Sequence, residues 1–364
     1  MTRQLVPAVI VANMRLYAIG FKFRQTLRQM IPLLVLSAAH FSYAQNVPVI
    51  SGAVAFETFT DGGATSYSAP YVEPFVTAPL GKHFLFETRD FLLESVSPRT
   101  SPQSDQTHLF YGVGFLQMNY YATNHLTFVA GKFLIPFGTY NERLTPVWIS
   151  NYLDSPLIFN IGTLAGGTGT GGEVRGSALS TSKVSIDYAA YLSSNVAGNH
   201  FTSTHGAGGR VDVYFPEARL EVGASYTRQL QNVNSNFSGF HVWWEPKNLP
   251  MRIRSEYAHA PHSQGYWIET TYRLSQWKGP NSVLGRLEPG FRMQQSFRNA
   301  PDPSDGLPSA DTQKTDFAMN YYLPHDVRLL TSYERQFSKT GNVNIWETGV
   351  VYHFVFPAWK GKKQ

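Results

Sequence analysis

The sequence has no cysteine, few charges and no long apolar run after residue 45, and each absence excludes a class of protein. Without cysteine, neither a disulfide scaffold nor a thiolate zinc site is possible. After Gln45 no apolar run reaches the length of about 18 residues that a transmembrane helix needs. Charged residues make up 15% of the chain, whereas Tyr and Phe number 20 and 25. This composition favours a chain rich in strands and interfacial aromatic residues.

The first 44 residues differ from the rest, because they contain five basic residues and no acidic one. An apolar run from Met30 to Phe41 follows, and then a small residue, Ala44. A basic region, a short apolar core and a small-residue end predict a secretory signal peptide over 1–44, with a buried helix as the alternative. The remaining chain holds 25 basic and 25 acidic residues, so the isoelectric point near 9.2 arises mainly from the signal. A nucleic-acid partner is therefore not expected.

Alternation of apolar and polar residues with a period of two recurs along the mature chain. Leu220, Val222 and Ala224 face one way, for example, while Arg219 and Glu221 face the other. The pattern predicts about sixteen strands. Their expected ranges are 49–59, 72–78, 83–95, 108–122, 125–133, 172–181, 183–193, 207–215, 218–230, 236–246, 249–260, 264–276, 284–298, 311–322, 326–338 and 343–354.

Two architectures fit such alternation, a soluble sandwich with its apolar face inward and a membrane barrel. Strands of about 9–13 residues, aromatic residues towards strand ends and a preceding signal peptide favour the barrel. Short connections also alternate with longer ones, which include 60–71, 96–107, 134–171, 194–206 and 299–310. We therefore predict an all-β, transmembrane, antiparallel up-and-down barrel over 45–354, followed by a short tail over 355–364. The expected location is the outer membrane of a Gram-negative bacterium.

The alternation breaks at residues 131–143, GKFLIPFGTYNER, where Pro136 and Gly138 interrupt a strand. No regular strand pattern returns for about 35 residues, and connections of this length usually carry function or are disordered. The sequence predicts that this connection, the third outward one, folds into the barrel and narrows its pore.

These residues, with Pro146, Trp148, Asp154 and Pro156-Leu157, resemble the constriction-loop region of the phosphate-selective porin O and P family. Segments 290–292, 315–323 and 333–337 resemble late hairpins of the same family. The resemblance implies a sixteen-stranded barrel, usually a trimer, with its third long loop folded inward. The expected constriction residues are Pro136, Phe137, Gly138, Asn141, Glu142, Arg143 and Asp154.

The resemblance implies a channel more strongly than it implies phosphate as the solute. Family members that select phosphate place several lysines on the inward loop. Between Leu134 and Gly171, Arg143 is the only basic residue of this chain. The expected function is passive diffusion of small hydrophilic solutes and ions, with a channel specific for phosphate, another anion or a sugar as the alternative.

Charged residues on the polar faces of the strands should line a wet lumen. One interpretation is a network of ion pairs that stiffens the wall. The other is a basic patch that faces Glu142 and Asp154 across the pore and selects ions. The expected patch consists of Arg252, Arg254, Arg273, Arg286 and Arg292. The remaining wall charges on these faces are Arg210, Arg219, Arg328, Asp212, Glu221, Glu256, Glu269, Glu288, Glu334 and Glu347.

Other motifs are weak. The glycine-rich segment 162–172 lacks the Lys-Ser/Thr ending of a phosphate loop, so we expect a return from the inward loop to the wall. The pairs His259/His262 and His200/His205 have no suitable carboxylate nearby, and neither a metal nor a cofactor is expected. Ser/His pairs lack an identifiable third group, so a barrel enzyme is the least favoured alternative. Expected partners are outer-membrane lipid and lipopolysaccharide, two further copies in a homotrimer, and small hydrophilic solutes.

Overall fold

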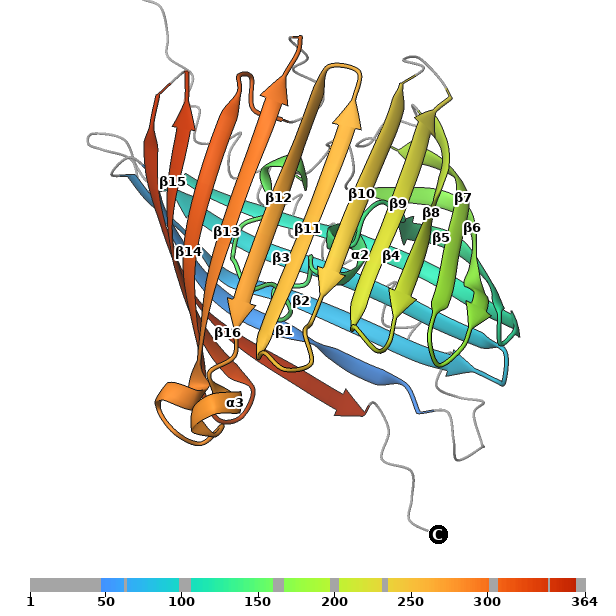
Figure 1. Cartoon of the computed structure of the whole chain (residues 1–364), viewed down its shortest axis with the longest axis horizontal. Helices are drawn as coiled ribbons and strands as arrows, with labels where there is room; N and C mark the ends of the chain where they lie inside the picture. Colours follow the sequence, from blue (N-terminus) through green and yellow to red (C-terminus); the bar gives the residue numbers. More distant parts are fainter. Residues whose placement is uncertain are drawn as a thin grey trace, which may run out of the picture. The chain divides into compact units, whose positions relative to one another are not determined.

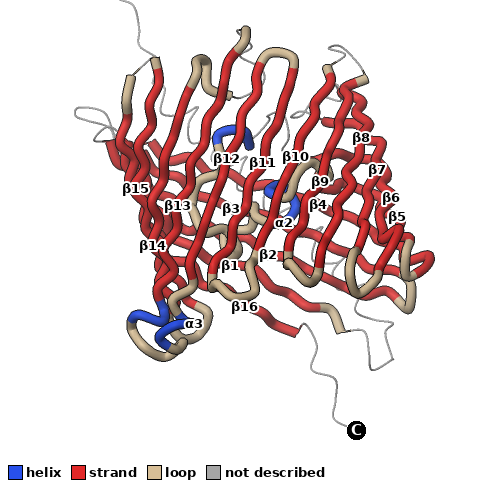
Figure 2. Tube along the Cα trace, viewed as in Figure 1, coloured by secondary structure: helices blue, strands red, loops and turns tan. Residues whose placement is uncertain are grey.

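The fold is taken from a computed structural model that describes residues 47–61, 64–97, 106–159, 167–196, 203–230, 235–300, 307–339 and 341–357. The predicted signal peptide over 1–44 and residues 358–364 of the predicted tail lie outside these ranges. Antiparallel strands make up almost all of the described chain (Figures 1 and 2). The strands are β1 (Val49–Asp61), β2 (Ala64–Leu80), β3 (Phe84–Ser97), β4 (Gln106–Thr123), β5 (Leu126–Leu134), β6 (Thr168–Ser180), β7 (Ser185–Val196), β8 (Ser203–Phe215), β9 (Leu220–Gln229), β10 (Asn236–Trp244), β11 (Met251–Ala260), β12 (Ser263–Tyr272), β13 (Leu287–Arg298), β14 (Thr312–Tyr322), β15 (Val327–Ser338) and β16 (Val343–Pro357).

These sixteen strands close into one barrel, in which each strand pairs with its neighbours in sequence. The closing pair is β1 with β16, and its register runs from Val49 opposite Pro357 to Asp61 opposite Ile345. Closure removes the unpaired strand edges that an open sheet would expose. Within the described ranges, no helix is long and apolar enough to cross a membrane. The predicted fold class and strand number are confirmed.

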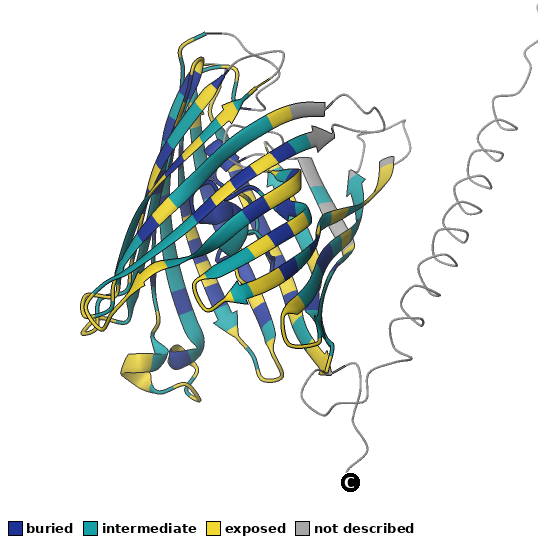
Figure 3. Cartoon of the chain, turned by 90° about the vertical axis from the view of Figure 1, so that its right-hand side faces the viewer, coloured by how far each residue is buried: buried dark blue, intermediate teal, exposed yellow. Residues whose placement is uncertain are grey.

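The two faces of the wall are opposite in character to those of a soluble protein. On β14, Lys314, Asp316 and Asn320 point inward and are 4%, 0% and 0% exposed. Phe317 and Met319, between them, point outward and are 55% and 38% exposed. Figure 3 shows the same alternation of buried and exposed positions along many strands. Because polar side chains face inward and apolar ones outward, the soluble sandwich is excluded for these strands.

Several predicted boundaries are wrong. Residues 60–71 do not form a long connection, because β1 reaches Asp61 and β2 already begins at Ala64. A longer connection joins β12 to β13 and contains the short helices α3 (Ser275–Lys278) and η2 (Leu284–Arg286). The last strand ends at Pro357, so it includes the first three residues of the predicted tail.

The connection between β5 and β6 is the third outward one and folds into the barrel, as predicted (Figure 2). It contains helix α2 (Tyr140–Arg143) and the 3-10 turn η1 (Leu157–Phe159). Its apolar residues pack with wall residues into a cluster on the inner face. That cluster comprises Val129, Phe133, Ile135, Phe137, Tyr140, Leu144, Ile158, Phe159, Tyr191, Ala258, Ala260, Trp267 and Leu307. The loop is thus held inside by hydrophobic burial as well as by polar contacts.

Candidate pore constriction

The loop leaves the wall at the end of β5 and turns inward at Ile135, Pro136 and Phe137, which are all buried. The Phe137 ring lies against Gly239 of β10, where an added Cβ would stand 2.7 Å from two ring carbons. The absence of a side chain at Gly239 therefore makes room for the ring. Tyr140 packs nearby against Trp267, with ring centroids 5.9 Å apart, and burial raises the pKa of Tyr140 to about 12.

Gly138 and the two residues after it connect the loop to the wall through backbone groups. The Gly138 N–H donates to Ser225 Oγ at 3.0 Å. The Tyr140 N–H and the Thr139 hydroxyl donate to Glu256 Oε1 at 2.7 and 2.6 Å. Gly138 has a φ of 61°, and a side chain there would strike the Glu256 carboxylate. Glycine is required for both reasons.

Asn141 holds the two ends of the loop together. Its Nδ2 donates to the carbonyls of Ile135 and Gly167 at 2.9 and 3.0 Å, and its Oδ1 accepts from the Gly167 N–H. Asn141 is 4% exposed. Asn141, which was predicted as a constriction residue, therefore links two parts of the loop and is shielded from open solvent.

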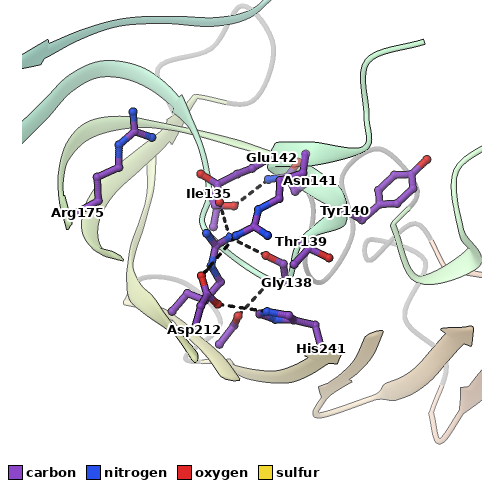
Figure 4. Close-up of polar contacts among 12 residues, drawn as sticks. Ile135, Gly138, Thr139, Tyr140, Asn141, Glu142, Arg175, Asp212 and His241 are labelled. Atoms are coloured by element: carbon purple, nitrogen blue, oxygen red, sulfur yellow. Dashed lines mark hydrogen bonds and ion pairs between the residues drawn. The ribbon is translucent and has the colours of Figure 1, made fainter. Parts of the chain in front are cut away.

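Glu142 and Arg143 on α2 both form ion pairs with wall residues (Figure 4 labels Glu142). Glu142 binds Arg210 of β8, which also donates to the Gly138 carbonyl at 2.6 Å. Arg143 donates to Glu221 Oε1 of β9 at 2.6 Å. With 36% of its side chain exposed, Arg143 also lines a cavity of about 210 Å³. The other lining residues are Tyr214, Arg219, Glu221, Trp243 and Glu245.

Asp154 comes later in the loop and contacts two wall cations. Its carboxylate forms ion pairs with Arg292 of β13 and Lys314 of β14. Arg292 also pairs with Asp316 at 2.6 Å, and Lys314 pairs with Glu334. Burial alone would raise the pKa of Asp154, but the two cations outweigh it and lower this pKa to about 2.

The five arginines of the predicted patch do not form one surface. Arg254 is 2% exposed, pairs with Glu269 at 3.3 Å and stacks 4.3 Å from the Trp243 ring. Arg292 is taken up by the contact with Asp154. The predicted strand 284–298 begins only at Leu287, so Arg286 lies on η2 instead of the wall.

Three of these arginines gather at the end of the barrel where the short turns lie. Arg252 and Arg273 both contact Glu288, the latter at 3.4 Å with half of its side chain exposed. Arg273 and Arg286 line a cavity of about 410 Å³. The predicted strand 264–276 included Arg273, but β12 ends at Tyr272, so Arg273 directly follows the strand. The two acidic loop residues were predicted to face the patch across the pore. Glu142 pairs instead with Arg210, and Asp154 is in direct contact with Arg292.

The sequence reasoning missed several inward wall residues, among them Glu73 and Lys314, which bind the loop, and His241, which lies between Asp212 and Glu221. Glu73 of β2 accepts from the Val147 N–H at 3.1 Å, while Arg328 donates to the Val147 carbonyl at 2.7 Å. The signal for Lys314 was present, because it shares the inward face of its strand with Asp316. His241 and Glu73 are surrounded by apolar neighbours in sequence and gave no comparable signal.

The glycine-rich segment predicted as a return to the wall is strand from Thr168 onward. An added Cβ at Gly171 would stand 3.0 Å from the Ser193 Cα of β7 and would also strike the Leu192 carbonyl. These glycines therefore allow close strand approach where the loop rejoins the barrel. Residues 160–166 lie outside the described ranges.

Known proteins resemble this chain in structure. An anion-selective porin from Comamonas acidovorans has a TM-score of 0.53 at 8% identity, covering 85% of this chain and 100% of that one. OmpT, an outer membrane protein of Vibrio cholerae, gives 0.54 at 11%, with 87% and 100% covered. Salmonella typhi OmpF, solved with daunomycin, gives 0.55 at 12%, with 85% and 98% covered.

At these low identities the likeness establishes the fold alone, a closed barrel like that of these three proteins. No protein-family profile and no curated protein matches the sequence. Membership of the phosphate-selective porin O and P family stays a prediction.

Proposed function

We propose that this chain is an outer-membrane porin of a Gram-negative bacterium, a water-filled channel through which small hydrophilic solutes and ions diffuse passively. The observation that carries the proposal is the inside-out wall of a closed barrel. Inward positions such as Arg292 and Glu334 are charged, whereas outward positions such as Phe317 and Trp346 are apolar and exposed. A lipid-facing apolar band and a polar lumen are what a bilayer requires of a barrel.

The inward loop is the proposed constriction. Its predicted residues have two roles. One group holds the loop in place and consists of Pro136, Phe137, Gly138 and Asn141. The other consists of the charged residues, which form ion pairs with the wall. Of the latter, Arg143 is the most open, with 36% of its side chain exposed against 18% for Glu142 and 20% for Asp154. Arg143 is therefore the loop charge best placed to meet a passing ion.

A weak anion preference is the selectivity that we propose. The loop acids were expected to face the basic patch across the pore and so create an electric field. Asp154 instead forms an ion pair with Arg292 and neutralises its charge. Two cations remain at the short-turn end, where the exposed Arg273 and the half-buried Arg286 line the cavity of about 410 Å³ beside a single acid, Glu288. Fixed positive charge at a pore mouth raises the local concentration of anions.

Planar-bilayer recordings test the channel and its selectivity together. In a KCl gradient, we expect Arg273→Gln with Arg286→Gln to move the reversal potential towards cation preference. The matched change Arg254→Gln should move it less, because Arg254 is buried and paired. Absence of any conductance from folded protein contradicts the porin proposal, and an unchanged reversal potential in the double variant contradicts the role of this cluster.

Liposome swelling separates the general channel from a solute-specific one. Sugars of increasing size should enter at rates that fall smoothly with size if diffusion is unselective. A single solute that enters faster than smaller ones, phosphate included, favours the alternative. Since Arg143 is the only basic residue between Leu134 and Gly171, we do not expect phosphate to be favoured.

A homotrimer embedded in outer-membrane lipid and lipopolysaccharide is the proposed assembly, and Lys132 supports it. Val129 and Phe133 of β5 point into the barrel, so Lys132 between them points outward, where it interacts electrostatically with Asp90 of β3. A charge that faces lipid is costly for a barrel, and an interface with another copy would cover it. Cross-linking through Lys132 in native membranes should yield trimers, and a purely monomeric pattern argues against the assembly.

A further inference from the structure

Three side chains on adjacent strands converge on the inner wall beneath helix α2. They are Asp212 of β8, Glu221 of β9 and His241 of β10. His241 Nε2 lies 3.2 Å from Asp212 Oδ1 and 3.5 Å from Glu221 Oε1. Figure 4 shows Asp212 and His241 pointing toward one another. We propose that these three residues bind a divalent transition-metal ion, with zinc as the reference chemistry.

The imidazole of His241 is the strongest sign of a ligand. Its side chain is 0% exposed, yet neither ring nitrogen makes a hydrogen bond, and Asp212 Oδ1 makes none either. Burying a polar group without a hydrogen bond is unfavourable, because the group loses its bonds to water and gains none in return. The short distances thus bring donor atoms together without hydrogen-bond geometry, and a metal ion among them would satisfy these atoms.

The spacing of the donor atoms suits a metal. Bonds from zinc to nitrogen or oxygen of about 2.1 Å place neighbouring ligands of a tetrahedron about 3.4 Å apart. The two measured separations, 3.2 and 3.5 Å, bracket this value, and all three donor atoms lie within 4.8 Å of one another. One imidazole and two carboxylates are also a ligand set that transition metals accept.

The wall leaves space for such a site at Gly223. This glycine of β9 pairs with Asp212 on one side and with His241 on the other. A Cβ at Gly223 would stand 2.5 Å from Asp212 Oδ1 and 2.6 Å from His241 Nε2. Any other residue would therefore fill the point at which the two side chains meet.

A second acidic cluster in the described chain, Asp154 with Asp316 and Glu334, does not make the same case. Lys314 Nζ contacts all three of its carboxylates, so the protein supplies the cation there. In the proposed site the group between the carboxylates is an imidazole, which carries no fixed charge.

The charge around the proposed site is also favourable. Four carboxylates there face two guanidinium groups, which leaves two negative charges for a divalent ion to balance. These groups are Glu142, Asp212, Glu221 and Glu256 with Arg143 and Arg210. Glu221 and Arg143 also line the cavity of about 210 Å³, from which an ion and a water ligand can enter.

Metal binding should act on the constriction through Arg143. The Arg143 Nη1 lies 2.6 Å from the same Glu221 oxygen that the ion would take, so ion and guanidinium compete for it. Occupancy would weaken one contact between α2 and the wall. Zinc added to the bilayer chamber should therefore change single-channel conductance, a readout that rests on the proposed channel function.

Cobalt absorption spectroscopy gives a readout that does not depend on transport. The full chain, without a polyhistidine tag, is folded in detergent, freed of metal with a chelator and titrated with Co²⁺. We expect saturable visible absorption bands at a single equivalent, displaced by Zn²⁺. Losing an outer-shell partner of a metal ligand typically weakens metal affinity about 10–100-fold. Because His241 would be a direct ligand, we expect His241→Gln to weaken Co²⁺ affinity by more than this. His108→Gln, an exposed histidine of β4, is the matched control.

Asp212→Asn provides a second variant of nearly unchanged volume, and heat-modifiable gel mobility verifies that each variant folds. Weak or absent Co²⁺ binding by the wild-type chain overturns the proposal. So does binding that survives in both His241→Gln and Asp212→Asn, or that His108→Gln abolishes. Normal conductance without metal binding refutes this site alone, whereas metal binding without conductance refutes the channel alone.

Discussion

Two of the places at which the constriction loop is held to the wall differ in physical character. The first anchor, residues 137–143, uses backbone donors that meet Glu256 and two opposite charges that meet Arg210 and Glu221. The second anchor, residues 150–157, inserts one carboxylate, Asp154, between two buried cations. The first anchor divides its charged contacts between two ion pairs and a carboxylate of the wall. The second has a single charged side chain, Asp154, beside neutral hydrogen bonds from Asn151 and Leu157 to the wall.

The two anchors also differ in their contact with open space. Arg143 of the first anchor is 36% exposed, whereas Arg292 of the second is 0% exposed and stacks 4.1 Å from the Tyr152 ring. Exposed ion pairs contribute little to stability, whereas breaking a buried pair leaves an uncompensated charge. We infer that the second anchor fixes the position of the loop and that the first presents charge to the pore.

The sharpest test of this division is Asp154→Asn. The change leaves Arg292 and Lys314 with one carboxylate fewer in a buried site, so we expect a loss of about 3 kcal/mol in the free energy of unfolding. The temperature at which the barrel loses its compact mobility in detergent gels should fall, and current through single channels should become noisier. Asp326→Asn, on an exposed turn, is the control. A gel transition unchanged from wild type would show that the second anchor is dispensable.

Acid should weaken the second anchor before it unfolds the wall. The pKa of Asp154 is lowered from 3.8 to about 2 by Arg292 and Lys314 against the effect of burial. Its stabilisation, about 2 kcal/mol, is therefore complete above about pH 4 and is lost as pH falls towards 2. The gel transition temperature, measured from pH 7 to 2, should fall more steeply for wild type than for Asp154→Asn below pH 4. Parallel curves would assign the acid sensitivity to other groups.

The strand number was predictable because alternation is a local property of a strand in contact with two different environments. The failure at 60–71 has a physical cause as well. This segment, TDGGATSYSAPY, has the composition of a loop, but its first two residues belong to β1, and backbone pairing with β1 keeps residues 64–71 in the sheet, with Ser68 opposite Glu57. Cross-strand pairing overrides composition there, and a single sequence does not show the partner strand.

The loop could be located from sequence, but its contacts could not. Its inward course followed from the break at Pro136 and Gly138, and its charged residues were recognised. Asp154 and Arg292 are 138 residues apart, and their contact depends on how far the loop descends and toward which strands it turns. For the same reason Glu142 was expected to face the basic patch, whereas it meets Arg210 of β8. His241 is the clearest example. The two carboxylates beside it, Asp212 and Glu221, come from two other strands, so the sequence around His241 does not indicate them.

Glu256→Gln weakens the first anchor at its strongest point. Glutamine keeps the size of the side chain and one oxygen acceptor but loses the charge that the N–H groups of Thr139 and Tyr140 approach. Hydrogen bonds to charged groups contribute more than neutral ones, so we expect a loss of about 1–2 kcal/mol. This loss should be smaller than that of Asp154→Asn when both are measured by the gel transition. Glu217→Gln, on an exposed turn, serves as the reference, and a loss larger than that of Asp154→Asn would invert the ranking of the two anchors.

Arg143→Gln should have the smallest effect on stability and a clear effect on transport, which separates the two roles most directly. The guanidinium is partly exposed, so losing its pair with Glu221 should cost at most about 1 kcal/mol. The same change removes the only basic residue of the inward loop and leaves Glu221 facing the cavity without its partner, so reversal potentials in a KCl gradient should shift toward cations. Lys247→Gln, at a short turn, removes an equal charge away from the loop and should shift them less. Equal shifts in both variants would mean that selectivity reflects the net charge of the barrel and that the first anchor has no special access to the pore.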